Sequence, residues 1–133
     1  MSTALVTSLR YPRAWFCAGL LIAVTITILS LLPAQRLPQI DVSDKIRHGF
    51  AYLVLGFWFA SVIARRDWLF VFLGLLALGG AIEIAQGLMK LGREADVADL
   101  TANAGGAAVG VLFAATPIGR WPAMLERLVS RGP

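Results

Sequence analysis

Four long apolar runs, separated by short polar segments, dominate the sequence of this chain of 133 residues. The runs cover residues 14–32, 46–64, 68–88 and about 97–116. A helix rises about 1.5 Å per residue, so a run of about 20 apolar residues crosses the hydrocarbon core of a bilayer. All six prolines lie outside the runs, where they interrupt no helix. The pattern predicts an all-α membrane protein, a bundle of four transmembrane helices forming one domain over residues 14–116.

The first run follows Arg10 and Arg13, as the apolar core of a cleaved signal peptide would. Such a core is about 7–15 residues long and ends in small residues of an Ala-x-Ala type. Residues 14–32 are a longer run, which ends at Leu32-Pro33-Ala34. We therefore expect residues 14–32 to be a retained span, preceded by a cytoplasmic lead of residues 1–13.

Residues 117–133 follow the last run and have a helical periodicity of their own. Trp121, Met124, Leu125, Leu128 and Val129 are spaced i, i+3, i+4, i+7 and i+8, which places them on one face of a helix. A frayed polar tail is the alternative. We expect a short amphipathic C-terminal helix that lies in the membrane interface on the cytoplasmic side.

Composition supports a membrane environment. The chain is 58% hydrophobic and 15% charged, with a mean hydropathy of +0.74, whereas soluble domains are about 45–50% apolar and about 25% charged. The net charge of +4 would suit a nucleic-acid partner in a soluble protein. Here the cations lie beside apolar runs, where they set topology and contact anionic lipid. We expect membrane lipid as a partner and no nucleic acid.

The distribution of cations predicts the orientation. With four spans, the side that holds both termini and the 65–66 turn carries seven cations and the other side carries five. The seven are Arg10, Arg13, Arg65, Arg66, Arg120, Arg127 and Arg131, and the five are Arg36, Lys45, Arg47, Lys90 and Arg93. Because positive residues accumulate on the cytoplasmic side, we expect both termini in the cytoplasm, with residues 33–43 and 89–96 facing outward.

Each of the last three runs carries one polar edge. Residues three or four apart share a face of a helix, and the polar residues keep that spacing. The stripes are Asp44, His48 and Tyr52; Glu83 and Gln86; and Arg93, Asp96, Asp99 and Asn103, with Lys45 beside the first. All of them fall in the same half of the bilayer. We expect these residues to line an outward-facing polar pocket that binds a ligand.

The residue types limit the chemistry of such a pocket. An ionisable side chain in a membrane span is costly and marks a functional site by default. Polar groups can also join helices by hydrogen bonds, which is the interpretation that we favour for Gln86 and Asn103. No serine or cysteine shares a polar face with His48, so a nucleophilic triad is not supported. His48 and Glu83 are candidates for acid–base catalysis.

A metal site is the other chemistry that the stripes allow. His48, Glu83, Asp96 and Asp99 offer the mixed nitrogen and oxygen ligands that divalent ions accept. The chain has one histidine, and no two of these residues form a close ligand pair. We therefore expect no metal and no cofactor.

The polar residues occur in an order that resembles the VanZ-like family of small bacterial membrane proteins. The shared pattern is Asp44-Lys45-x-x-His48-x-x-x-Tyr52-x-x-Leu55-Gly56, then Glu83-x-x-Gln86, then Arg93-x-x-Asp96-x-x-Asp99-x-x-x-Asn103-x-x-Gly106-x-x-x-Gly110. The three blocks cover about residues 35–112. The resemblance implies a helical domain of four or five spans in the bacterial cytoplasmic membrane.

The namesake of this family is associated with resistance to teicoplanin, a lipid-anchored glycopeptide that binds peptidoglycan precursors outside the cell. The resemblance thus implies a cell-envelope role linked to resistance to teicoplanin-type glycopeptides. Our leading hypothesis is a protein whose pocket binds an anionic, amide-rich or lipid-linked envelope molecule without catalysis. The alternatives are a membrane-embedded acid–base enzyme acting on a lipid-linked substrate and a structural or assembly subunit.

Overall fold

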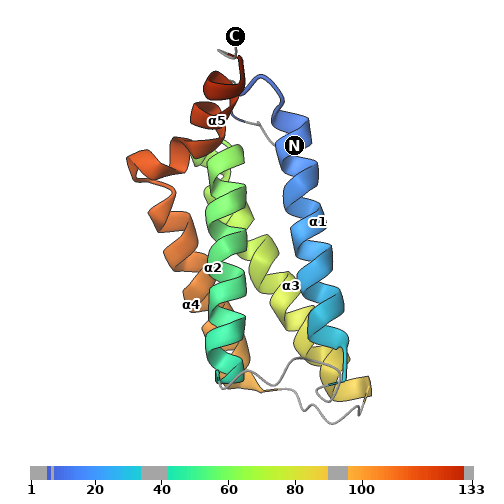
Figure 1. Cartoon of the computed structure of the whole chain (residues 1–133). Coiled ribbons are helices and arrows are strands. Elements are labelled where there is room, and N and C mark those ends of the chain that lie inside the picture. Colours follow the sequence, from blue (N-terminus) through green and yellow to red (C-terminus); the bar gives the residue numbers. More distant parts are fainter. Residues whose placement is uncertain (1–5, 7, 34–41, 90–95, 131–133) are drawn as a thin grey trace.

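The computed structural model describes residues 6, 8–33, 42–89 and 96–130, and its regular elements are helices. The long helices are α1 (Pro12–Leu31), α2 (Asp44–Val62), α3 (Trp68–Met89), α4 (Val97–Phe113) and α5 (Trp121–Ser130), and the short 3₁₀ helices are η2 (Arg65–Asp67) and η3 (Pro117–Arg120). Figure 1 shows α1 to α4 side by side, with α5 and the start of α1 at one end. The start of α2, the end of α3 and the start of α4 lie at the other end.

The polar residues between the apolar runs explain where the helices begin. The Ser43 hydroxyl accepts a hydrogen bond from the Ile46 N–H at 3.4 Å, and the Asp96 carboxylate accepts one from the Ala98 N–H at 2.8 Å. Both side chains are N-caps, which satisfy backbone donors that the first turn leaves free. Between α2 and α3 only the short η2 is inserted, so these two helices form the antiparallel hairpin that the short polar turn predicts.

The described helices that are long and apolar enough to cross a bilayer number fewer than the four spans that the sequence predicts. Among the described residues, α1 and the segment Arg65–Met89 can cross a bilayer alone. The pair Val97–Phe113 and Pro117–Ser130, bent by 78°, counts as a third only if it is one broken span. The first turns of α2 carry Lys45, Arg47 and His48, and α4 has 17 residues. The described part of the chain is therefore all-helical with two to three candidate membrane-spanning helices, and a four-span arrangement stays a prediction.

Helix α2 is the centre of the bundle. It contacts α1, α3, α4 and α5, and its residues Tyr52, Leu55 and Phe59 are buried in the core. Large apolar side chains on the outer faces of the surrounding helices are more than half exposed; examples are Leu21 on α1, Leu69 on α3 and Leu112 on α4. Exposed apolar surface on this scale suits a lipid environment.

The C-terminal tail forms a helix, as its periodicity predicts, and docks on the bundle. The Glu126 carboxylate accepts hydrogen bonds from the N–H groups of Arg10 and Tyr11 and from the Trp15 indole at 2.6, 3.0 and 2.9 Å. The Trp121 ring lies 5.0 Å from the rings of Trp15 and Trp58. Trp121 therefore faces the bundle, whereas the other four apolar residues of the predicted face are exposed; these are Met124, Leu125, Leu128 and Val129.

Glycines allow the backbones of α2 and α4 to touch, and this is the most extensive helix contact in the bundle. A Cβ atom at Gly106 would overlap the carbonyl oxygen of Gly49, and one at Gly110 would overlap the carbonyl oxygen of Leu53. From the other side, a Cβ at Gly56 would lie 2.6 Å from the Ala107 carbonyl oxygen. The Gly106-x-x-x-Gly110 pattern is thus a packing motif, in which small residues permit close helix approach.

We predict that Gly106→Ala lowers stability by about 1–3 kcal/mol, the usual cost of inserting a methyl group into a tight contact. Gly105→Ala is the matched control, because a Cβ there would meet no atom within 4 Å. Both variants gain the same helix propensity, so the difference between them reports the contact alone. Thermal unfolding in detergent, followed by tryptophan fluorescence, measures it. Equal midpoints for the two variants would contradict the packing described here.

Candidate functional site

Three helices bring four polar side chains together at the end of the bundle where α2 and α4 begin (Figure 1). This polar cluster consists of His48 from α2, Glu83 from α3, and Asp99 and Asn103 from α4. The His48 Nδ1 atom lies 3.2 Å from the Asn103 Oδ1 atom and 3.8 Å from the Glu83 Oε1 atom. His48, Glu83 and Asp99 each place one possible ligand atom within 4.8 Å of the others. All four side chains are at least nine-tenths buried.

A glycine on α3 makes room for the deep end of the cluster. A Cβ atom at Gly79 would lie 3.0 Å from the Asn103 Nδ2 atom and 3.3 Å from the Tyr52 hydroxyl. Tyr52 is buried among the apolar core residues. The hydroxyl and the amide therefore point to the same small space beside α3, one turn of α2 beyond His48.

An ion pair covers the shallow end and forms the rim of the site. The Lys45 ammonium lies 3.2 Å from the Asp96 Oδ2 atom, and both side chains are about half exposed. The Asp96 N–H donates a hydrogen bond to the Glu83 Oε2 atom at 3.0 Å. The rim is thus connected to the buried cluster through the backbone at the start of α4.

The charges of the rim support each other. The hydrogen bond from the Ala98 N–H, and next the hydrogen bond from Lys45, hold the pKa of Asp96 below its usual value. The hydrogen bond and charge of Asp96 raise the pKa of Lys45 in turn. Both groups are therefore ionised at neutral pH.

Several buried polar atoms of the cluster and of the neighbouring Tyr52 lack a hydrogen-bond partner among the described residues. They are the Tyr52 hydroxyl, Glu83 Oε1, Asp99 Oδ1 and Asn103 Nδ2. A buried polar group without a partner costs roughly 1–3 kcal/mol. Two of these atoms are acceptors and two belong to donors, so the cluster can receive either a cation or a polar ligand.

Not every residue of the three predicted stripes reaches the cluster. The Gln86 amide donates to the Ser30 carbonyl of α1 at 2.8 Å, so it joins helices, as we favoured for it. The Asp44 carboxylate lies 3.2 Å from the Arg47 guanidinium on the exposed face of α2. Arg93 lies outside the described residues. Asn103, for which we favoured the same interpretation, lies 3.2 Å from His48 on α2, so it joins two helices from within the cluster.

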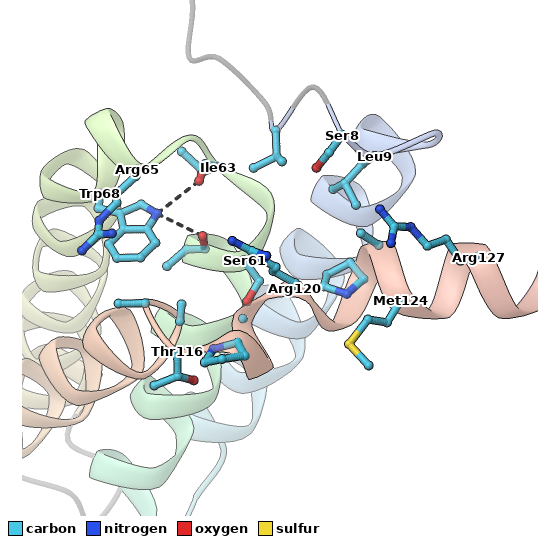
Figure 2. Close-up of a pocket in the computed structure, with 18 residues that line it drawn as sticks. Ser8, Leu9, Ser61, Ile63, Arg65, Trp68, Thr116, Arg120, Met124 and Arg127 are labelled. Atoms are coloured by element: carbon cyan, nitrogen blue, oxygen red, sulfur yellow. Dashed lines mark hydrogen bonds between the residues drawn. The ribbon is translucent and has the colours of Figure 1, made fainter.

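A cavity of about 720 Å³, which no sequence pattern indicates, lies at the opposite end of the bundle. We call it the terminal cavity (Figure 2). Its described lining includes Arg65, Arg120 and Arg127, with no acidic residue. The Trp68 indole fixes one wall by donating to the carbonyls of Ala60 and Ile63 at 3.0 and 3.1 Å. The arginines had suggested only topology, because nothing in their spacing indicates that three helical segments meet there.

The fold and the polar cluster define a class: small helical membrane proteins that bury an ionisable site among three helices near one end. The chain belongs to the VanZ/LLP1 family, whose model matches residues 21–118. The match includes α2, α3 and α4 and therefore every residue of the polar cluster and its rim. A search of curated proteins and a search of solved structures each found no match.

We predict that Asp96→Asn lowers the unfolding temperature at pH 7 and that Asp96→Ala lowers it further. Asparagine keeps the N-cap but loses the charge, whereas alanine loses both. Because the folded-state pKa of Asp96 is lowered, its charge stabilises the fold above the ordinary value of about 3.9. That contribution is lost as the pH falls through the folded-state pKa. The wild-type and Asp96→Asn curves should therefore converge in acid, and curves that already coincide at pH 7 would refute the rim ion pair.

Proposed function

We propose that this VanZ/LLP1 protein acts in the cell envelope by binding an anionic or amide-rich part of an envelope molecule at the polar cluster and its rim. One observation carries the proposal: a buried, ionisable cluster has donors and acceptors without hydrogen-bond partners among the described residues, beside a half-exposed ion pair. Such groups are expensive in an apolar bundle and are retained for function by default.

The rim supplies the chemistry for an anionic ligand. The Lys45 ammonium is half exposed and would form charge-assisted hydrogen bonds with a phosphate or carboxylate. The Lys45 ammonium donates a hydrogen bond to the Asp96 carboxylate, and the Asp96 N–H donates one to the Glu83 carboxylate. A change in the buried cluster would therefore reach the ligand through the rim. Arg93, outside the described residues, is proposed as a second cation.

The proposed orientation in the membrane decides which side of the membrane the polar cluster faces. The arginine-rich end carries Arg65, Arg120 and Arg127 around the terminal cavity, and the positive-inside rule assigns such an end to the cytoplasm. The polar cluster at the opposite end then faces outward, where teicoplanin-type glycopeptides and their peptidoglycan precursors meet. Protection against such compounds is the role that we propose, in the cytoplasmic membrane with both termini inside.

A second candidate function is acid–base catalysis on a lipid-linked envelope substrate. The His48 Nδ1 atom lies 3.8 Å from the Glu83 Oε1 atom, and both side chains are more than nine-tenths buried. That spacing is slightly longer than a hydrogen bond, as is common for catalytic pairs without substrate. In this reaction His48 would transfer the proton and Glu83 would orient the ring and stabilise its charged form.

We predict that His48→Ala, Glu83→Gln and Asp99→Asn each abolish protection while the protein stays in the membrane. A bacterial strain lacking the gene is complemented with wild type or one variant, and susceptibility to teicoplanin-type glycopeptides is measured together with membrane abundance. Glu83→Gln keeps the shape but removes the charge, so full abundance with lost protection places function in the cluster. Lost abundance in all three variants would favour a structural subunit instead.

Arg120→Gln is the matched control, because it removes a charge at the terminal cavity and leaves the cluster intact. The proposal expects this variant to protect as well as wild type does. Loss of protection in Arg120→Gln at full abundance would move the ligand site to the terminal cavity. Equal susceptibility with and without the wild-type gene would refute the resistance role.

A further inference from the structure

Two carboxylates share one buried space in the polar cluster. Glu83 is 5% exposed and Asp99 is 9% exposed, and their nearest possible ligand atoms lie within 4.8 Å of each other. Two buried negative charges at this distance repel strongly in a medium of low dielectric constant. The Lys45 ammonium is hydrogen-bonded to Asp96 at the rim. Something positive must therefore lie between the two carboxylates if both are ionised.

We propose that His48, Glu83 and Asp99 bind one divalent transition-metal cation, through an imidazole nitrogen and two carboxylate oxygens. Ligand atoms about 2.1 Å from one ion lie at most about 4.2 Å apart. The three ligand atoms lie within 4.8 Å of one another, and the distance between His48 Nδ1 and Glu83 Oε1 is 3.8 Å. Rotations of the three side chains would bring all three ligand atoms into range of one ion.

The hydrogen bond of Glu83 and the buried carboxylate oxygens of Glu83 and Asp99 support this assignment independently. Glu83 Oε2 accepts a hydrogen bond from the Asp96 N–H at 3.0 Å, whereas Glu83 Oε1, which lies 3.8 Å from His48 Nδ1, has no hydrogen-bond partner among the described residues. Asp99 Oδ1 is likewise buried and unpartnered within the described part of the chain. A ligating carboxylate commonly has the division seen at Glu83, with one oxygen bound by a protein donor and the other directed to the ion.

Asn103 extends the ligand set. Its Oδ1 atom lies 3.2 Å from His48 Nδ1, so this ring nitrogen faces two oxygen atoms, from Asn103 and from Glu83. Either a proton on Nδ1 or a cation beside it must separate them. A cation satisfies Glu83 and Asp99 as well, which a single proton on the ring does not.

The ligand types select the cation. One imidazole with carboxylate and amide oxygens suits Mn²⁺, Fe²⁺ or Zn²⁺, whereas Ca²⁺ and Mg²⁺ prefer oxygen alone. The sequence led us to expect no metal, because the chain has one histidine and no close ligand pair. The structure brings the three ligands together from three separate helices. The inference adds an ion to the site of the proposed function, yet its test uses no envelope ligand, so either proposal can fail alone.

The test measures Mn²⁺ bound to the full chain, purified in detergent through a histidine-free affinity tag. After incubation with Mn²⁺ and removal of unbound ion, elemental analysis gives the metal content, and pulsed electron paramagnetic resonance detects nitrogen bound to manganese. His48 is the single histidine of the chain, so an imidazole coupling can come from this residue alone. We expect about one ion per chain with one coupled imidazole nitrogen.

Variants locate the two oxygen ligands. Glu83→Gln and Asp99→Asn should each weaken Mn²⁺ binding by more than about 10-fold. Asp44→Asn is the matched control: it removes a carboxylate from the same end of the bundle, but one that lies against Arg47 on the exposed face, and it should retain the ion. If the two site variants fail to fold, the nitrogen coupling in wild type still shows whether His48 binds the ion.

Three results would overturn the proposal. Wild type that retains neither Mn²⁺ nor, in a parallel loading, Zn²⁺ would indicate that the carboxylates share a proton. Bound Mn²⁺ without nitrogen coupling would place the ion at surface carboxylates. Equal retention by wild type and a folded Glu83→Gln variant would exclude Glu83 as a ligand.

Discussion

The close contact between α2 and α4 is the constraint on which the rest of the structure depends. Glycines at 56, 106 and 110 remove the side chains that would hold the two backbones apart. His48 directly precedes Gly49, and Asn103 lies one turn before Gly106, so the contact between these glycines places the two polar side chains opposite each other at 3.2 Å. Helix α3 then needs only a long side chain, Glu83, to complete the cluster from the third side.

The proposed functional site is also the place where burial of ionisable groups is least favourable for folding. An apolar bundle gains little from ionisable groups, since burying a charge without a partner is unfavourable. Two contacts offset part of this unfavourable free energy: the Asp96 N–H donates a hydrogen bond to Glu83, and the Asn103 amide lies beside the His48 ring. The acceptors and donors that stay unpartnered within the described residues are the part that a ligand or an ion would satisfy. The opposite end is built differently, from arginines, tryptophans and the docked α5 helix.

Much of the fold could be predicted from the sequence, because helical periodicity is local. The apolar runs match α1 to α4 within a few residues, and the amphipathic tail is a helix. The family assignment holds over residues 21–118. The number of spans stays a prediction. The first turns of α2 are polar and α4 has 17 residues, so neither helix qualifies alone as a span by length and apolarity.

The site could be predicted only in outline. Periodicity shows which residues share an edge of a helix but not which neighbour that edge meets. Gln86 therefore faces Ser30 on α1 instead of the cluster, and Asp44 faces Arg47. Trp121 turns from the predicted interfacial face to the rings of Trp15 and Trp58. Such pairings follow from tertiary packing, which no spacing along one helix encodes.

The most direct test of a buried cluster shared by three helices is the ¹⁵N magnetic resonance spectrum of the imidazole in histidine-labelled protein in lipid bilayers. His48 is the single histidine, so the spectrum reports one ring. The structure predicts that the ring signals move in Glu83→Gln and in Asn103→Ala but not in Arg120→Gln, since the first two residues contact the ring and the third lines the terminal cavity. Ring signals that are unchanged in both cluster variants would contradict the account.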